Sequence, residues 1–154
     1  MTSSLHSQSP AGASDPASGG RRGLPWWLAI AGAAAAAVVV NLLIFSIGNA
    51  ADASFVVPQP NAKPQTVGAG GVIFSSSVPL AVGAGIAVLL ARWWPVMLRV
   101  AQAVGGVLAL LSALAPLSSD ADGATRIALA SMHVVVGVAF VAALEAYRRR
   151  RIAR

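Results

Sequence analysis

The sequence contains no cysteine, which excludes disulfide bonds, thiol catalysis and thiolate metal sites. Acidic residues are also scarce, with five Asp and Glu against 11 Lys and Arg. Charged residues make up only 10% of the chain, whereas soluble domains carry about a quarter. The basic residues gather at the ends of apolar runs and form no nucleic-acid patch. This shortage of charge indicates a protein whose main solvent is lipid.

Long apolar runs are what the chain has in abundance. Hydrophobic residues make up 56% of the sequence, and the mean hydropathy is +0.73. A helix of about 20 residues, at roughly 1.5 Å per residue, crosses a bilayer core of about 30 Å. We therefore predict an all-α membrane protein, a four-transmembrane-helix bundle in a single domain. The predicted spans are residues 25–47, 72–91, 95–117 and 126–147.

The two ends of the chain differ from these spans. Residues 1–24 are rich in Ser, Ala, Gly and Pro, which predicts a disordered cytoplasmic tail. Arg21 and Arg22 precede the first apolar run, and Ala51-Asp52-Ala53 offers a signal-peptidase pattern after it. The run is about 22 residues long, however, and the apolar region of a signal peptide is about 7–15. We therefore predict an uncleaved first span, and a basic cytoplasmic tail over residues 148–154.

Orientation follows from the positions of the basic residues. With both termini inside, nine of the 11 Lys and Arg lie in the cytoplasm, leaving only Lys63 and Arg126 outside. All four tryptophans fall at the same cytoplasmic interface, where indole rings favour the boundary between lipid and water. The sequence predicts a multi-pass protein of the plasma membrane with both termini cytoplasmic.

Two features suggest how the spans associate. The third span carries Ala101, Gly105, Ala109 and Ala113 at four-residue spacing, a ridge of small residues that favours close helix approach in lipid. The link over residues 48–71 contains three prolines, which argues against a continuous helix. Because its residues 55–57 are apolar, we predict that this link packs partly over the exoplasmic mouth of the bundle.

Each span carries a polar group in one layer, roughly 5–10 Å from its exoplasmic end at 1.5 Å per residue. Polar side chains at this depth tend to face the bundle interior and pair. One interpretation is a functional pocket centred on His133; the other is simple interhelical hydrogen bonding, with His133 donating to Asn41 or a serine. Both predict contact between Asn41 and His133. The candidate pocket residues are Asn41, Ser75, Ser76, Ser77, Ser112 and His133.

Catalytic and metal-binding patterns are not legible in the sequence. A single histidine within the spans does not make a zinc site, and no Ser-His-Asp arrangement is visible. Asp120 and Asp122 precede Gly123, but the further ligands of a calcium loop are missing. We expect Asp122 or Thr125 to cap the last helix instead. The sequence predicts no metal, no cofactor and no enzymatic activity.

Several short segments are informative when taken together. They are Asn41-Leu-Leu-Ile-Phe45, Phe55-Val-Val-Pro58, Pro64-Gln-Thr-Val-Gly68-Ala69, Ser77-Val-Pro79-Leu80, and Asp120 to Arg126 leading to Met132-His133-Val-Val-Val-Gly137. Together they resemble a family of small, uncharacterised four-span membrane proteins of actinobacteria. The resemblance covers about residues 25–147 and implies four spans, but no activity comes with it.

These observations favour a non-enzymatic structural or partner-binding module. The alternative is a small transporter or channel with His133 in its pathway, and a water path past His133 would distinguish the two. Expected partners are the lipid bilayer and either another membrane protein or a second copy of the chain; we expect no nucleic acid. Anionic lipid head groups are expected to contact Arg148, Arg149, Arg150 and Arg151.

Overall fold

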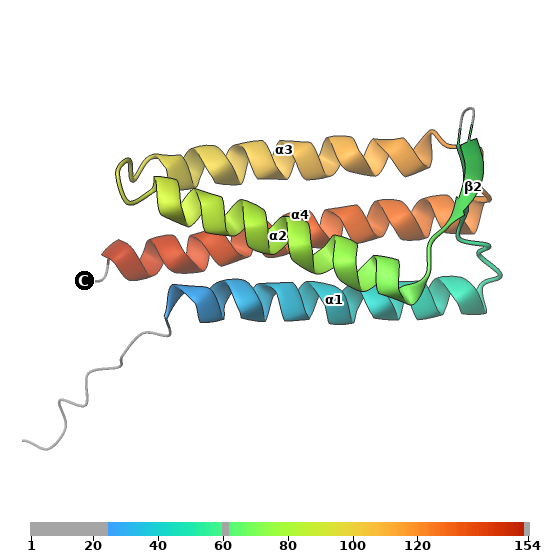
Figure 1. Ribbon diagram of the computed structural model, residues 1–154, viewed down its shortest axis with the longest axis horizontal. Helices are drawn as coiled ribbons and strands as arrows, with labels where there is room; N and C mark the ends of the chain where they lie inside the picture. The colour runs from blue at the N-terminus through green and yellow to red at the C-terminus, as the bar shows by residue number, and fades with distance from the viewer. Residues whose placement is uncertain (1–24, 60–61, 153–154) are drawn as a thin grey trace, which may run out of the picture.

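The computed structural model describes residues 25–59 and 62–152, so the predicted N-terminal tail lies outside the described part. The described residues form four helices and one small hairpin (Figure 1). All four helices are long and apolar enough to cross a membrane. The predicted four-helix membrane fold is confirmed. The elements are α1 (Trp26–Ala50), β1 (Val56–Gln59), β2 (Ala62–Thr66), α2 (Ala69–Leu90), α3 (Met97–Leu117) and α4 (Gly123–Ile152).

Local chemistry explains where the helices begin and end. Pro25 precedes α1, where the missing N–H of proline has no helical partner to lose. Asp122 caps α4 as predicted, because its Oδ1 accepts the Thr125 N–H at 2.8 Å. Helix α4 continues to Ile152, beyond the predicted end at residue 147. Its last turn carries arginines, which are good helix formers and favour the negative end of the helix dipole.

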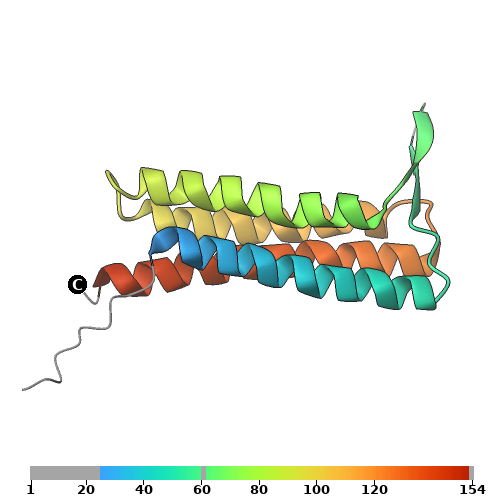
Figure 2. The same cartoon turned by 60° about the horizontal axis from the view of Figure 1, so that its bottom comes forward.

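Helix α4 is the centre of the bundle and packs against the other three helices, most extensively against α3 and α1. Helix α2 packs mainly on α1 and touches α3 little. Figure 1 shows why: α2 meets α3 at their short turn and diverges from it toward the hairpin. We call the end with that turn and the start of α1 the basic end, and the opposite end the hairpin end. Figure 2 shows the start of α1, the α2–α3 turn and the end of α4 together at the basic end.

The core consists of two clusters separated along the bundle. The cluster in the basic half is built from α1, α2, α3 and α4, and its small residues allow the helices to approach closely. The cluster at the hairpin end joins the loop after α1 to α2 and α4. The first contains Ile30, Ala37, Leu80, Ala84, Ala87, Val88, Ala91, Leu98 and Leu144, and the second Ala53, Phe55, Val72, Ala128 and Met132.

The link between α1 and α2 packs on the bundle as predicted, through Phe55. This side chain is buried, and its ring lies 4.6 Å from that of Phe45, measured between centroids. Gly48 makes room for it, because a Cβ at that position would meet the Phe55 ring. The Phe55 backbone has φ 50°, a left-handed conformation that is strained for an aromatic residue. Its burial and two backbone hydrogen bonds, to Thr125 and Val67, hold it there.

Candidate functional site

A cavity of about 490 Å³ lies where α2 and α3 diverge, in the hairpin half of the bundle. Helices α2, α3 and α4 form its walls, and Asn41 from α1 and Val67 from the link complete it. Five of the six predicted pocket residues line it: Asn41, Ser75, Ser76, Ser112 and His133. Sequence depth alone therefore identified residues from all four helices that the fold brings to one cavity.

Asn41 ties three helices together at the edge of this cavity. Only 1% of the residue is exposed. Its Nδ2 donates to the Ser76 Oγ of α2 at 2.8 Å and to the Met132 carbonyl oxygen of α4 at 3.3 Å. Its Oδ1 is buried and accepts no hydrogen bond from the described residues. Asn41 thus positions α1 against α2 and α4.

Asn41 and His133, for which the sequence predicts side-chain contact, are not hydrogen-bonded to each other. The Nδ1 of His133 lies 2.7 Å from the Leu129 carbonyl oxygen, one turn earlier in its own helix. The reason is the rotation of α4. Successive helical residues point about 100° apart, so the buried Met132 faces α1 while the next residue faces the gap between α2 and α3.

His133 is consequently exposed to the cavity. Because a carbonyl oxygen only accepts, Nδ1 carries the hydrogen in this contact, and Nε2 is left for another partner. Nε2 has no partner among residues 25–59 and 62–152. The Ser112 hydroxyl on α3 likewise makes no hydrogen bond with the described residues. The cavity therefore offers one ring nitrogen and one hydroxyl to a binding molecule.

The three serines of α2 have different roles. Ser76 is buried and accepts from Asn41. Ser75 faces the cavity but donates to the Val72 carbonyl oxygen of its own helix at 3.3 Å. Ser77 lies outside the cavity lining and donates to the Ile73 carbonyl oxygen at 2.7 Å. One helical turn does not point three consecutive residues in the same direction, so the cavity includes only part of this run.

Phe140 closes the cavity toward the basic end. Its ring packs against Gly83 of α2 and Gly105 of α3, and a Cβ on Gly105 would collide with it. One turn closer to the hairpin end, Gly137 of α4 faces the Cβ of Ala109 on α3. The predicted ridge of small residues on α3 thus packs on α4 at Gly105 and Ala109. Beyond Phe140, toward the basic end, the interior continues as an apolar cluster that includes Ala84, Ala87 and Leu98.

Asp122 joins several hydrogen-bonding groups at the hairpin end, outside the membrane-spanning segments. Its Oδ2 accepts from the Ser54 hydroxyl at 2.6 Å and from the Thr125 hydroxyl at 2.7 Å. Thr125 Oγ1 in turn accepts the Phe55 N–H at 2.9 Å. The Ser54 hydroxyl, followed by the Thr125 N–H and hydroxyl, holds the pKa of the Asp122 carboxyl well below its usual value. These bonds fix the link to the start of α4.

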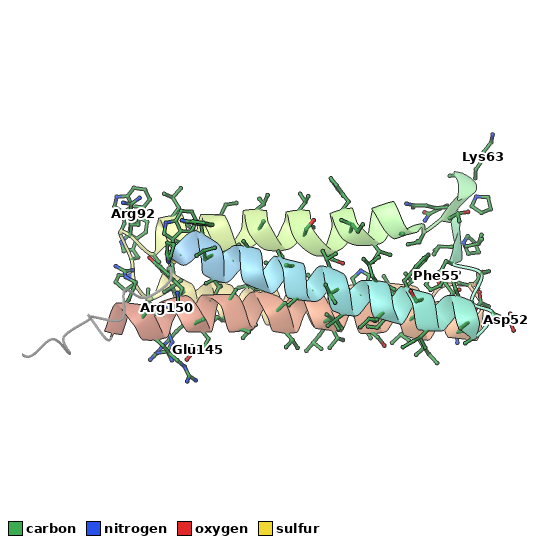
Figure 3. The ribbon with its side chains drawn as sticks, turned by 90° about the horizontal axis from the view of Figure 1, so that it is seen from below. Asp52, Phe55, Lys63, Arg92, Glu145 and Arg150 are labelled. Carbon is green, nitrogen blue, oxygen red and sulfur yellow. The ribbon has the colours of Figure 1, made fainter. Side chains whose placement is uncertain are left out.

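At the basic end, Glu145 pairs with Arg148 at 2.8 Å and with Arg149 at 2.7 Å, three and four residues further along α4. Gln102 of α3 donates to Glu145 and to the Val141 carbonyl oxygen across the helix interface. Figure 3 shows Glu145, Arg92 and Arg150 at this end, opposite Lys63 and Asp52. No group of three or more metal-ligating side chains occurs within the described part of the chain.

Sequence reasoning missed the apolar part of the site. Leu108, Pro79 and Phe140 line the cavity, but nothing distinguishes them from other apolar residues of the spans. The Ser54–Asp122 bond was also missed, because it joins residues 68 positions apart. One signal was present: the Gly105 ridge marked the face of α3 that packs on α4.

A family of unknown function, DUF6069, matches residues 21–150. No curated protein and no solved structure gives a significant match to the chain. The match covers α1, α2, α3, the hairpin, all but the last two residues of α4, and every residue of the cavity. The chain therefore belongs to DUF6069, a family whose function is not known.

Proposed function

We propose that this protein is a non-enzymatic, partner-binding module of the plasma membrane, and that its binding site is the cavity between α2 and α3. The observation that carries the proposal is that two polar groups of the lining, His133 Nε2 and the Ser112 hydroxyl, have no hydrogen-bond partner among the described residues, although they lie on helices long and apolar enough to cross a membrane. Polar groups left without hydrogen bonds in an apolar medium are costly. A partner that places a matching polar group in the cavity recovers that cost.

The chemistry of the lining supports binding over catalysis. His133 is the one titratable residue among the described residues that line the cavity. Its Nδ1 is held by a backbone carbonyl, whereas a catalytic histidine is typically oriented by a carboxylate and paired with a nucleophile. The remaining lining is mostly apolar and small, which suits contact with an apolar surface.

The end of the cavity that Phe140 closes favours a binding module over the alternative, a small transporter or channel. A transport path past His133 requires an opening toward the basic end. There the Phe140 ring fills the space between Gly83 and Gly105, and a buried apolar cluster follows. If the protein were a transporter, Phe140→Ala would increase solute or proton flux in reconstituted vesicles. We expect no flux in the wild-type protein or in this variant.

The proposed location is the plasma membrane, with the basic end and both termini in the cytoplasm. The exposed Trp26, Trp27, Trp93 and Trp94 at that end support this orientation, because indole rings favour the membrane interface. We also infer that the four-span architecture extends to actinobacterial relatives of the chain.

The partner is proposed to be a membrane helix, from another protein or from a second copy of this chain. A photoreactive amino acid at position 108, which lines the cavity, tests this directly. Position 110 is the matched control, because Leu110 is exposed on the same helix but outside the lining. We expect a discrete protein crosslink from position 108 and none from position 110, and we expect Ser112→Phe to abolish it by filling the cavity.

The product identifies the partner. A crosslinked species of twice the chain's mass indicates a second copy, and any other discrete species indicates a different membrane protein. Equal products from both positions, or lipid adducts alone, would contradict the partner-binding function.

A further inference from the structure

A second recess lies at the basic end, away from the cavity between α2 and α3. Its volume is about 470 Å³. Pro95 and Val96 come from the α2–α3 turn, and Leu98 and Arg99 from the first turn of α3. Arg148 and Arg151 come from the end of α4 and share one face, because helical residues three apart are neighbours. The recess therefore joins three guanidinium groups from two helices.

The recess is positively charged, because its lining includes three arginines and, among the described residues, no carboxylate. Arg148 pairs with Glu145, and Arg151 donates its Nη1 to the Ala91 carbonyl oxygen at 2.7 Å. The Arg99 side chain makes no hydrogen bond or ion pair with the described residues. A guanidinium has five N–H donors, so these contacts leave most of the donors available.

We propose that this recess binds the phosphate of an anionic phospholipid. Guanidinium groups match phosphate oxygens in geometry as well as in charge. The apolar wall of Pro95, Val96 and Leu98 suits the part of the lipid attached to the phosphate. Trp93 and Trp94, exposed in the same turn, favour the membrane interface, where lipid phosphates lie. This site does not depend on the cavity between α2 and α3.

The site differs from the whole arginine run expected from the sequence. Only Arg148 and Arg151 of that run line the recess, and Arg99 from α3 joins them. The Arg149 side chain is 78% exposed, pairs with Glu145 and is not part of the lining. The fold thus separates the arginines that can share one phosphate from Arg149, which lies outside the recess.

The test measures which lipids the full-length protein retains from mixed nanodiscs of phosphatidylglycerol and phosphatidylcholine, read by native mass spectrometry. We expect the wild-type protein to retain phosphatidylglycerol preferentially. Arg99→Gln should lower this preference about fivefold, and Arg151→Gln by a similar factor, from the strength of one arginine near an anionic surface. Arg149→Gln removes the same charge outside the recess and should leave the preference unchanged.

Arg99→Gln is the decisive variant, because the Arg99 side chain has no bond in the described structure whose loss would disturb folding. Arg151→Gln also removes the contact with Ala91, so its thermal unfolding is measured alongside. If Arg149→Gln lowered the preference for phosphatidylglycerol as much as Arg99→Gln, diffuse positive charge would explain the binding and the proposed site would be wrong. Displacement of phosphatidylglycerol by inorganic phosphate would reassign the site to a free anion, and no preference for phosphatidylglycerol in the wild-type protein would refute it.

Discussion

Asn41 shows how a single amide can fix the positions of three helices in lipid. It gives both hydrogens of Nδ2 to neighbouring helices, while its Oδ1 has no partner in the described part of the chain. Lipid supplies no hydrophobic drive for helix association, so interhelical hydrogen bonds and close packing carry more of the specificity. The cost of the buried, unpartnered oxygen offsets part of this gain.

The bond between Asn41 and Ser76 is testable by a double-mutant cycle. We expect Asn41→Ala and Ser76→Ala each to destabilise the bundle, with the double variant costing less than the sum. Hydrogen bonds between membrane helices average about 0.6 kcal/mol, with a maximum near 1.7 kcal/mol, so the coupling should fall in that range. Unfolding in detergent with increasing denaturant measures it, and strict additivity would show that the two side chains do not interact in solution.

At the scale of elements, glycines set the distance between α3 and α4. A Cβ on Gly137 would collide with the Cβ of Ala109, which has no freedom to move aside. We expect Gly137→Ala to destabilise the bundle by about 1–3 kcal/mol, the usual cost of overpacking. Thermal unfolding in detergent measures the effect.

Gly85→Ala is the control for this change, since it lies on α2 with open space around its Cβ position. It should be neutral or slightly stabilising, because alanine favours the helix. If both variants behaved alike, the close approach of α3 and α4 would not control stability.

The link between α1 and α2 is held to α4 by Asp122, and this contact predicts a pH dependence. Its pKa in the fold lies below the unfolded value of about 3.9. The hydrogen bonds to Ser54 and Thr125 therefore stabilise the fold fully above that pH. This stabilisation is lost as the pH falls toward the folded-state pKa.

We expect the unfolding temperature of the wild-type protein to decrease below about pH 4 and Asp122→Asn to flatten that decrease. Asp120→Asn is the matched control, because the exposed Asp120 makes no side-chain hydrogen bond with the described residues. Unfolding temperature measured against pH in detergent compares the three proteins. If the unfolding temperature of Asp122→Asn fell at low pH as much as that of the wild-type protein, Asp122 would not anchor the link.

At the scale of the whole molecule, the two ends differ in charge. The basic end carries Arg92, Arg99 and the arginines at the end of α4, whereas the hairpin end carries Lys63 and Arg126. In a membrane this asymmetry sets the orientation. Cysteines introduced at Lys63 and Arg92, in a chain with no native cysteine, should react with an impermeant thiol reagent from opposite faces of the cell membrane. Labelling of both from the outside would contradict the proposed topology.

The sequence by itself determined the class of fold, because the length of each apolar run and the scarcity of charge leave few structures possible in lipid. It also gave the depth of Asn41, Ser112 and His133, since depth depends only on counting residues along a helix. The capping of α4 by Asp122 and the pairing of Glu145 with Arg148 were predictable from residue spacing. Each is a contact within a few residues along the chain.

Only the tertiary structure decided which of these groups meet. Whether His133 faces Asn41 or the gap between α2 and α3 depends on the rotation of α4, which is set by Gly137 against Ala109 and by Phe140 between two glycines. The divergence of α2 from α3 creates the cavity, and their turn brings Arg99 to Arg148 and Arg151. Helix rotation and tilt are fixed by side-chain packing between distant segments, and residue spacing within one helix carries no information about either.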